Sequence, residues 1–219
     1  ERSMKEHLYI ILLALLLASY DTTNCTFTAC TNGGLQTPVT CGITISVGLT
    51  MREKCDILKQ HNALRSYVAA GLEKRGNPGP QPAALNMKTM RWDTHLACMA
   101  QTWANNCKFA HDPCRKDGRF YVGQNIGSWM TNGTLVTTWA DIIKLWYDKV
   151  TKVNRSQIQC YSNSIDWADY TQLVWATSDK LGCGKIVYQS ADGFKHYYIV
   201  CNYGPGGNIG TMSVYEPET

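Results

Sequence analysis

Apolar positions recur at helical spacing in three stretches of the chain. The first stretch follows Thr50, and Thr50 with Glu53 fits a capping box, so a helix is expected to begin near residue 50. Its predicted stripe consists of Ile57, His61, Leu64, Val68 and Leu72. The loop 75–82 is rich in Pro and Gly and cannot continue a helix.

Two further helices are predicted after this loop. Asp93 can cap a helix whose inward stripe would be Leu96, Ala100, Trp103 and Cys107. Another helix is expected over 139–153, with an inward stripe of Trp139, Ile142, Trp146 and Val150.

The C-terminal part of the chain has β character. Strand-like runs at 185–189 and 195–203 flank Asp192-Gly193, which is a strong hairpin signal. If the turn centres on residue 192, Cys183 and Cys201 lie opposite each other, and a cross-strand disulfide is sterically reasonable. Helices and hairpin together predict an α+β domain in which helices could cover both faces of an antiparallel sheet, an α-β-α sandwich.

The N-terminus reads as a targeting segment. The apolar run from Leu8 to Ala18 is too short to cross a hydrocarbon core of about 30 Å, so no transmembrane anchor is expected. A signal peptide over 1–23 is favoured over a buried N-terminal helix because polar residues follow at once. The remaining chain divides into a Cys-rich extension, 24–49, and one main domain, 50–219.

Composition narrows the function classes. The 219 residues include ten cysteines, which in a secreted chain indicate disulfides rather than a metal cluster. The net charge of +4 is mild and no long basic run occurs, so nucleic acid is not an expected partner. Sequons predict glycosylation at Asn24, Asn132 and Asn154.

Two segments carry a family resemblance. The runs 169–175 and 198–208 resemble the two signature motifs of the CAP superfamily, which includes the antigen 5 venom allergens. Four more runs, 61–65, 75–82, 103–107 and 123–126, are similar to antigen 5 segments in the same order. The resemblance implies a single-domain CAP fold, sets the layer order of the sandwich, and implies an extracellular, allergenic protein of arthropod venom or saliva.

The resemblance also implies a central cleft that in many relatives holds two His and two acidic side chains, which can bind a divalent cation. The matching positions here are His111, Gln124, Lys149 and Asp169. Because Lys149 adds an ammonium group and only one imidazole remains, no metal and no cofactor is expected. Lys149 and Asp169 either form an exchanged ion pair or act separately, with Lys149 in solvent and Asp169 as a local cap.

Three functions are open. The resemblance favours a non-enzymatic monomer that binds a small hydrophobic ligand, such as a fatty acid, eicosanoid or sterol, in a groove between helices. The candidate groove residues are Leu64, Val68, Leu72, Trp139, Ile143 and Trp146, although apolar stripes of this kind are more often simply core. The alternatives are an effector directed at a host extracellular protein and a weak hydrolase using His111 with Ser128 or Ser164, for which the spacing offers no support. His61 is expected to be a core residue.

The disulfide pattern follows partly from the resemblance. It implies Cys183–Cys201, Cys41–Cys107 and Cys30–Cys114. The four remaining cysteines allow three pairings, of which Cys55–Cys98 is favoured because it joins the starts of two helices. Cys25–Cys160 then follows by elimination.

Overall fold

The structure is a computed structural model that describes residues 41–133 and 138–218. The predicted signal peptide, Asn24, Cys25 and Cys30 lie outside the described residues. The larger elements are β1 (Ile43–Val47), α2 (Met51–Ala69), α3 (Thr94–Ala104), β5 (Gly123–Thr131), α4 (Trp139–Tyr147), α5 (Ala168–Leu173), β6 (Lys180–Gln189) and β7 (Lys195–Gly204). The short elements are β2 (Arg91–Trp92), β3 (Lys116–Asp117), β4 (Phe120–Tyr121) and the 3₁₀ turns Asp148–Lys152 and Arg155–Ile158.

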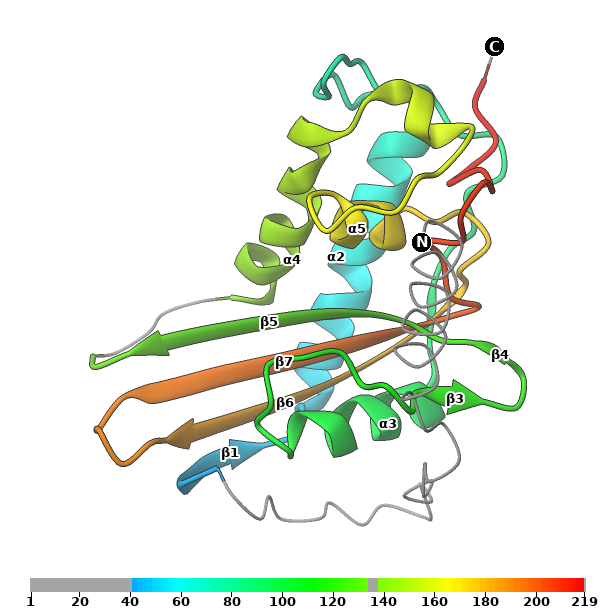
Figure 1. The fold of residues 1–219 in the computed structure, drawn as a ribbon. Helices are drawn as coiled ribbons and strands as arrows, with labels where there is room; N and C mark the ends of the chain where they lie inside the picture. Colours follow the sequence, from blue (N-terminus) through cyan, green and yellow to red (C-terminus); the bar gives the residue numbers. More distant parts are fainter. Residues whose placement is uncertain (1–40, 134–137, 219) are drawn as a thin grey trace, which may run out of the picture.

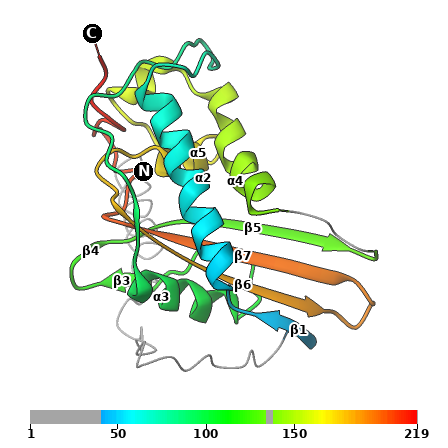
Figure 2. The same ribbon diagram turned by 180° about the vertical axis from the view of Figure 1, so that it is seen from behind.

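The main sheet has the strand order β1-β6-β7-β5, with antiparallel neighbours throughout. The short strand β2 also joins β6, in parallel, so two separate segments share the outer edge of β6. Helices α2, α4 and α5 lie on one face of the sheet and α3 lies on the other (Figure 1 and Figure 2). This arrangement is the α-β-α sandwich that the sequence predicts.

The two faces of β6 and β7 supply two hydrophobic cores. Tyr198 and Val200 are buried with Ala100 of α3, whereas Ile199 and Cys201 are buried in the larger core with α2, α4 and α5. The alternation follows from the two-residue period of a strand that is covered on both faces. The hairpin register pairs Cys183 with Cys201, as the turn at Asp192-Gly193 predicts.

The predicted helix starts are confirmed. Thr50 and Glu53 form a reciprocal capping box at the start of α2, and the Asp93 carboxylate accepts the N–H of Leu96 at the start of α3. The helix expected over 139–153 is shorter, because α4 ends at Tyr147 and continues as a 3₁₀ turn. Strand β1 lies within the predicted N-terminal extension, so this part of the extension belongs to the sheet.

Helix α3 packs unusually close to β6. A Cβ at Gly184 would lie 2.4 Å from the Cα of Gln101, and a Cβ at Gly182 would lie 2.1 Å from the N of Ala97. Backbone atoms cannot yield as a flexible side chain does, so both positions require glycine. These two glycines therefore set the depth at which α3 rests on the sheet.

The disulfide predictions are partly confirmed. Cys183–Cys201 staples the hairpin and Cys41–Cys107 fixes the start of the described chain near the end of α3. Cys98 and Cys114 are also disulfide-bonded, while Cys55 and Cys160 are exposed free thiols. The pairings Cys55–Cys98 and Cys25–Cys160 are therefore wrong, and Cys30 of the predicted Cys30–Cys114 bridge lies outside the described residues.

The error has a physical origin. Cys55 is an exposed residue of α2, and Cys98 lies on the wall of a cavity that separates α3 from the start of α2. A position near the start of a helix is not sufficient for a disulfide. The two Cα atoms must also lie within about 7 Å of each other, with the Cβ atoms directed towards one another.

Candidate functional site

The four cleft positions form two pairs. His111 is exposed and its Nδ1 lies 3.1 Å from the Oε1 of Gln124, which also accepts the backbone N–H of Asp112 at 3.0 Å. The Nε2 of Gln124 donates to the Oδ1 of Asn202 at 2.9 Å. Because the amide oxygen accepts, the Nδ1 of His111 carries the proton in this contact. An amide, and not a carboxylate, therefore faces His111 in this cleft.

Lys149 and Asp169 form the second pair. The Lys149 Nζ lies 2.6 Å from the Asp169 Oδ2, and the side chains are 34% and 18% exposed. The Lys149 Nζ also donates to the carbonyl oxygen of Ile165 at 3.3 Å. The exchanged ion pair is therefore present, and the alternative in which Lys149 projects into solvent is not what the structure shows.

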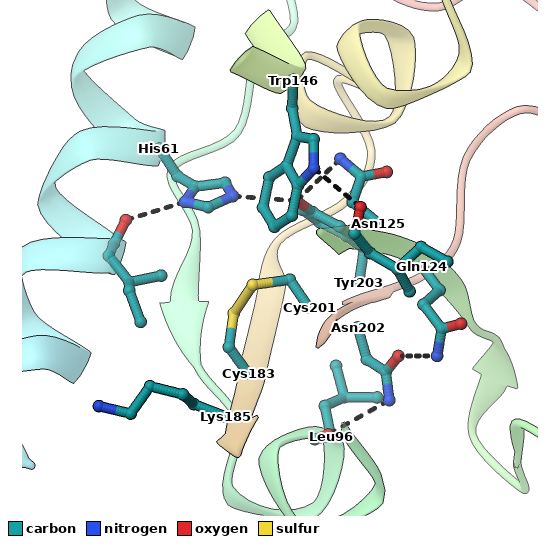
Figure 3. The surroundings of a disulfide bond; sticks show 12 residues. His61, Leu96, Gln124, Asn125, Trp146, Cys183, Lys185, Cys201, Asn202 and Tyr203 are labelled. Atoms are coloured by element: carbon teal, nitrogen blue, oxygen red, sulfur yellow. Dashed lines mark hydrogen bonds between the residues drawn. A yellow bond between two sulfur atoms is a disulfide. The ribbon is translucent and has the colours of Figure 1, made fainter. Parts of the chain in front are cut away.

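A buried hydrogen-bond network adjoins Asp169, and Figure 3 shows three of its members, His61, Asn125 and Tyr203. Asn125 donates to the backbone carbonyl of Asp169 at 3.0 Å and to the hydroxyl of Tyr203 at 3.2 Å. The same hydroxyl lies 3.0 Å from the Nε2 of His61, whose Nδ1 lies 2.8 Å from the carbonyl oxygen of Ile57. Since a carbonyl only accepts, Nδ1 holds the proton and Nε2 accepts from Tyr203.

Burial lowers the pKa of His61 to about 4, and the nearby Arg65 adds to this, against the hydrogen bond to Ile57 that opposes it. His61 is fully buried and neutral at physiological pH. It is a structural residue, in agreement with the prediction that it belongs to the core.

Core side chains fill the space between α2 and α4 where the ligand groove was predicted. Val68, Trp139, Ile143 and Trp146 are buried members of the larger core, and Leu64 packs against it. Leu72 is 49% exposed, beyond the end of α2. This packing does not support an open groove at these six residues, whose periodicity reflects the core.

A cavity of about 530 Å³ lies elsewhere, between the start of α2, one face of α3 and the edge of the sheet. The α3 wall consists of residues at helical spacing, namely Thr94, Ala97, Cys98, Gln101, Thr102 and Asn105. The opposite wall is the β1–α2 connection with Glu53 and Lys54, and Trp92, Cys183 and Lys185 complete the lining. None of the sequence patterns predicts this cavity.

Glu53 is fixed within the cavity wall. Its carboxylate pairs with Lys185 at 2.5 Å and accepts hydrogen bonds from Thr50 and from the indole of Trp139. Burial alone would raise the pKa of Glu53, but these donors outweigh it and lower the pKa to about 2. The carboxylate is therefore ionised and paired across the physiological pH range.

The hydrolase hypothesis finds little geometric support. Within the described residues, His111 hydrogen bonds with neither Ser128 nor Ser164. A serine–histidine contact does occur at the β6–β7 turn, where the Ser190 Oγ lies 2.8 Å from the His196 Nε2. Asp192 hydrogen bonds with Ser190 and not with His196, so among the described residues no carboxylate hydrogen bonds to the imidazole as a catalytic triad requires.

Neither a metal-binding cluster nor a membrane-spanning helix occurs among residues 41–133 and 138–218. No group of three His, Cys, Asp or Glu side chains within these ranges could hold a metal ion. None of the described helices is both long and apolar enough to span a bilayer. Asn132 is exposed and the Asn154 side chain caps a 3₁₀ turn, and glycosylation of either stays a prediction.

Similarity to known proteins agrees with these features. Residues 58–203 match the CAP family, described as the cysteine-rich secretory protein family. The chain belongs to this family. It is 44% identical to venom allergen 5 of Vespa velutina over 187 residues, which cover 84% of this chain and 91% of the relative. It is also 44% identical to venom allergen 5 of Dolichovespula arenaria, with 87% and 94% of the two chains covered.

Solved structures share the fold of this CAP protein. The crystal structure of NaASP2 with Zn²⁺ superposes with a TM-score of 0.64 at 30% identity, covering 78% of this chain and 88% of that one. The structure of BmVAL-1 also gives a TM-score of 0.64, at 26% identity, with coverage of 78% and 84%. These likenesses confirm the α+β CAP fold.

Proposed function

We propose that this antigen 5-type CAP protein is secreted and acts without catalysis, as a binding protein for small hydrophobic ligands. The observation that carries the proposal is the cavity between α2, α3 and β6. Its volume of about 530 Å³ lies in the range that encloses a drug-sized ligand. Its lining combines apolar side chains, among them Val47, Leu49 and Trp92, with many polar groups, of which Glu53, Gln101 and Lys185 are held in place by hydrogen bonds.

The central cleft supports a non-catalytic role. NaASP2, a relative at 30% identity, has been crystallised with Zn²⁺, whereas this chain places the Lys149 ammonium against Asp169 and an amide against His111. An ammonium repels a divalent cation, and one imidazole is too few neutral ligands for a zinc site. No activated nucleophile is visible among the described residues, so metal-assisted and covalent hydrolysis both lack their groups.

Native mass spectrometry of the protein purified from its natural source tests the proposal. A bound species in the mass range of fatty acids, eicosanoids or sterols is expected, and titration calorimetry with members of these classes should reproduce its binding. Absence of a retained ligand, together with no heat in any titration, would contradict the carrier function.

A further inference from the structure

We propose that the cavity selects ligands with an anionic head group, such as the carboxylate of a small apolar acid. The inference rests on the proposed carrier function and deepens it. Three observations on the described residues carry it. They are a break in the strand pairing of β6, the saturation of the only carboxylate among the described lining residues, and a lysine at the cavity wall that pairs with no described carboxylate.

The break in pairing exposes one peptide group. Antiparallel pairing of β1 with β6 ends at Val47–Ile186, with one further bond from the Gly48 N–H to the Lys185 carbonyl at 2.9 Å. Parallel pairing of β2 ends at Trp92–Leu181, with one further bond from the Asp93 N–H to the Leu181 carbonyl at 2.8 Å. Between them, the amide of Gln101 takes the place of a strand: its Oε1 accepts the N–H of Lys185 at 2.9 Å and its Nε2 donates to the Lys185 carbonyl at 2.9 Å. Lys185 therefore directs its backbone groups outward from the sheet.

Cys183 directs its backbone groups in the same direction, because strand residues two apart share an orientation. The Cα atoms of Cys183 and Cys201 are 4.1 Å apart, which is typical of a pair that exchanges no backbone hydrogen bonds (Figure 3). The N–H of Cys183, which lines the cavity, thus points away from β7 towards the gap between β1 and β2. A donor in this position suits a ligand that brings an acceptor.

The charges of the lining favour an anion. The described lining residues include two lysines, Lys54 and Lys185, and one carboxylate, Glu53, so together they carry one positive charge in excess. The Glu53 carboxylate has about four acceptor positions. Four donors already fill them, namely the Lys185 ammonium, the Trp139 indole, and the backbone N–H and hydroxyl of Thr50. An amine ligand therefore finds no free acceptor on Glu53.

Two lysines keep donors for a ligand. Lys54 is partly buried on the cavity wall and forms no ion pair with the described residues. The Lys185 ammonium has three N–H donors, of which Glu53 takes one. A carboxylate that enters the cavity can therefore accept charge-assisted hydrogen bonds while its apolar part contacts Trp92, Leu49 and Ala97.

Dodecanoate and dodecanol test this inference, since they share a chain and differ in the head group. Titration calorimetry of the full protein should show that dodecanoate binds about tenfold more tightly. Lys54→Met should remove most of that preference with little effect on dodecanol. Lys59→Met is the matched control, because Lys59 lies on α2 outside the cavity and is exposed, and it should keep the preference. Ala97→Phe should fill the cavity and weaken both ligands.

The outcomes separate the head-group inference from the carrier function. Equal affinity of wild type for the two ligands, or equal effects of Lys54→Met and Lys59→Met, would overturn the inference and leave the carrier function intact. Unchanged binding by a folded Ala97→Phe variant would place the ligand outside this cavity. Failure of wild type to bind any tested lipid class would remove the carrier function itself. The two lysine variants leave the core untouched, so they decide the case if Ala97→Phe does not fold.

Discussion

His61 shows how a single buried side chain controls the pH range of stability. Its pKa in the folded protein is about 4, against an ordinary value of 6.5. Between pH 6.5 and pH 4 the His61 imidazole is therefore protonated in the unfolded chain but remains neutral in the folded protein. The contribution of His61 to stability is complete above pH 6.5 and is lost as the pH falls towards 4.

We expect this loss to reach about 3 kcal/mol in the free energy of unfolding between pH 6.5 and pH 4. Urea unfolding of wild type and of His61→Asn at several pH values measures it, because the difference between the two curves cancels other titrating groups. The variant should be less stable at pH 7 and should show a shallower decline. Parallel curves would mean that His61 is not held neutral.

Lys149 and Asp169 give a second prediction at the scale of residues. A cycle of Lys149→Met, Asp169→Asn and the double variant should give a coupling energy of about 1 kcal/mol, because the pair is only partly exposed. Lys152 and Asp166 serve as a matched control, with the same charges 2.7 Å apart but more than half exposed side chains.

The control pair should couple more weakly, since solvent screens exposed charges. Chemical denaturation of the variants measures both coupling energies. Equal values for the two pairs would show that burial in the cleft adds nothing to the Lys149–Asp169 contact.

At the scale of elements, the close contact of α3 with β6 predicts that one added methyl group strongly lowers the stability of the fold. Gly184→Ala would bring a Cβ to 2.4 Å from the Cα of Gln101, so α3 would have to move away from β6. We expect a loss of about 2–3 kcal/mol in the free energy of unfolding, measured by urea denaturation. Gly118→Ala is the control, since no atom lies within 4 Å of its added Cβ, and it should be nearly neutral.

Some elements could be predicted from local signals, and others could not. Caps at Thr50 and Asp93 and the turn at Asp192-Gly193 act within a few residues, so the sequence displays them directly. Strand β5, with two glycines and several polar residues, forms because it pairs along its length with β7. That pairing depends on residues far away in the chain, and no local pattern encodes it.

The candidate site divides in the same way. The Lys149–Asp169 contact could be predicted because the family resemblance places both residues in one cleft, where their charges are opposite. The cavity could not, because it arises where β1 and β2 leave part of β6 unpaired and Gln101 fills the space of a strand. Helical spacing correctly predicted that Val68 and Ile143 face inward. Side chains at inward positions of packed helices fill the space between the helices, so they leave no groove for a ligand.

At the scale of the whole molecule, the thiol pattern makes a clear prediction. Alkylation of the folded protein followed by peptide mapping should label Cys55 and Cys160, which are exposed and free. Cys183 and Cys201 serve as the internal control and should remain bridged. Recovery of Cys55 or Cys160 within an intramolecular disulfide would contradict the structure, as would labelling of Cys183.

Arg65 of α2 joins distant parts of the same molecule. Its buried guanidinium donates to the carbonyl oxygens of Lys88, Leu173, Trp175, Ala176 and Ser178. No carboxylate hydrogen bonds to it among the described residues, so backbone carbonyls take the place of a counter-ion.

A guanidinium that loses part of its acceptors while buried is costly. Arg65 keeps all its acceptors only when the segment around Lys88 and the turn that ends α5 both contact α2. A state in which one of them is detached is therefore disfavoured. The segment around Lys88 and the turn that ends α5 must dock on α2 together, and this charge makes two remote stretches of chain fold as one cooperative unit.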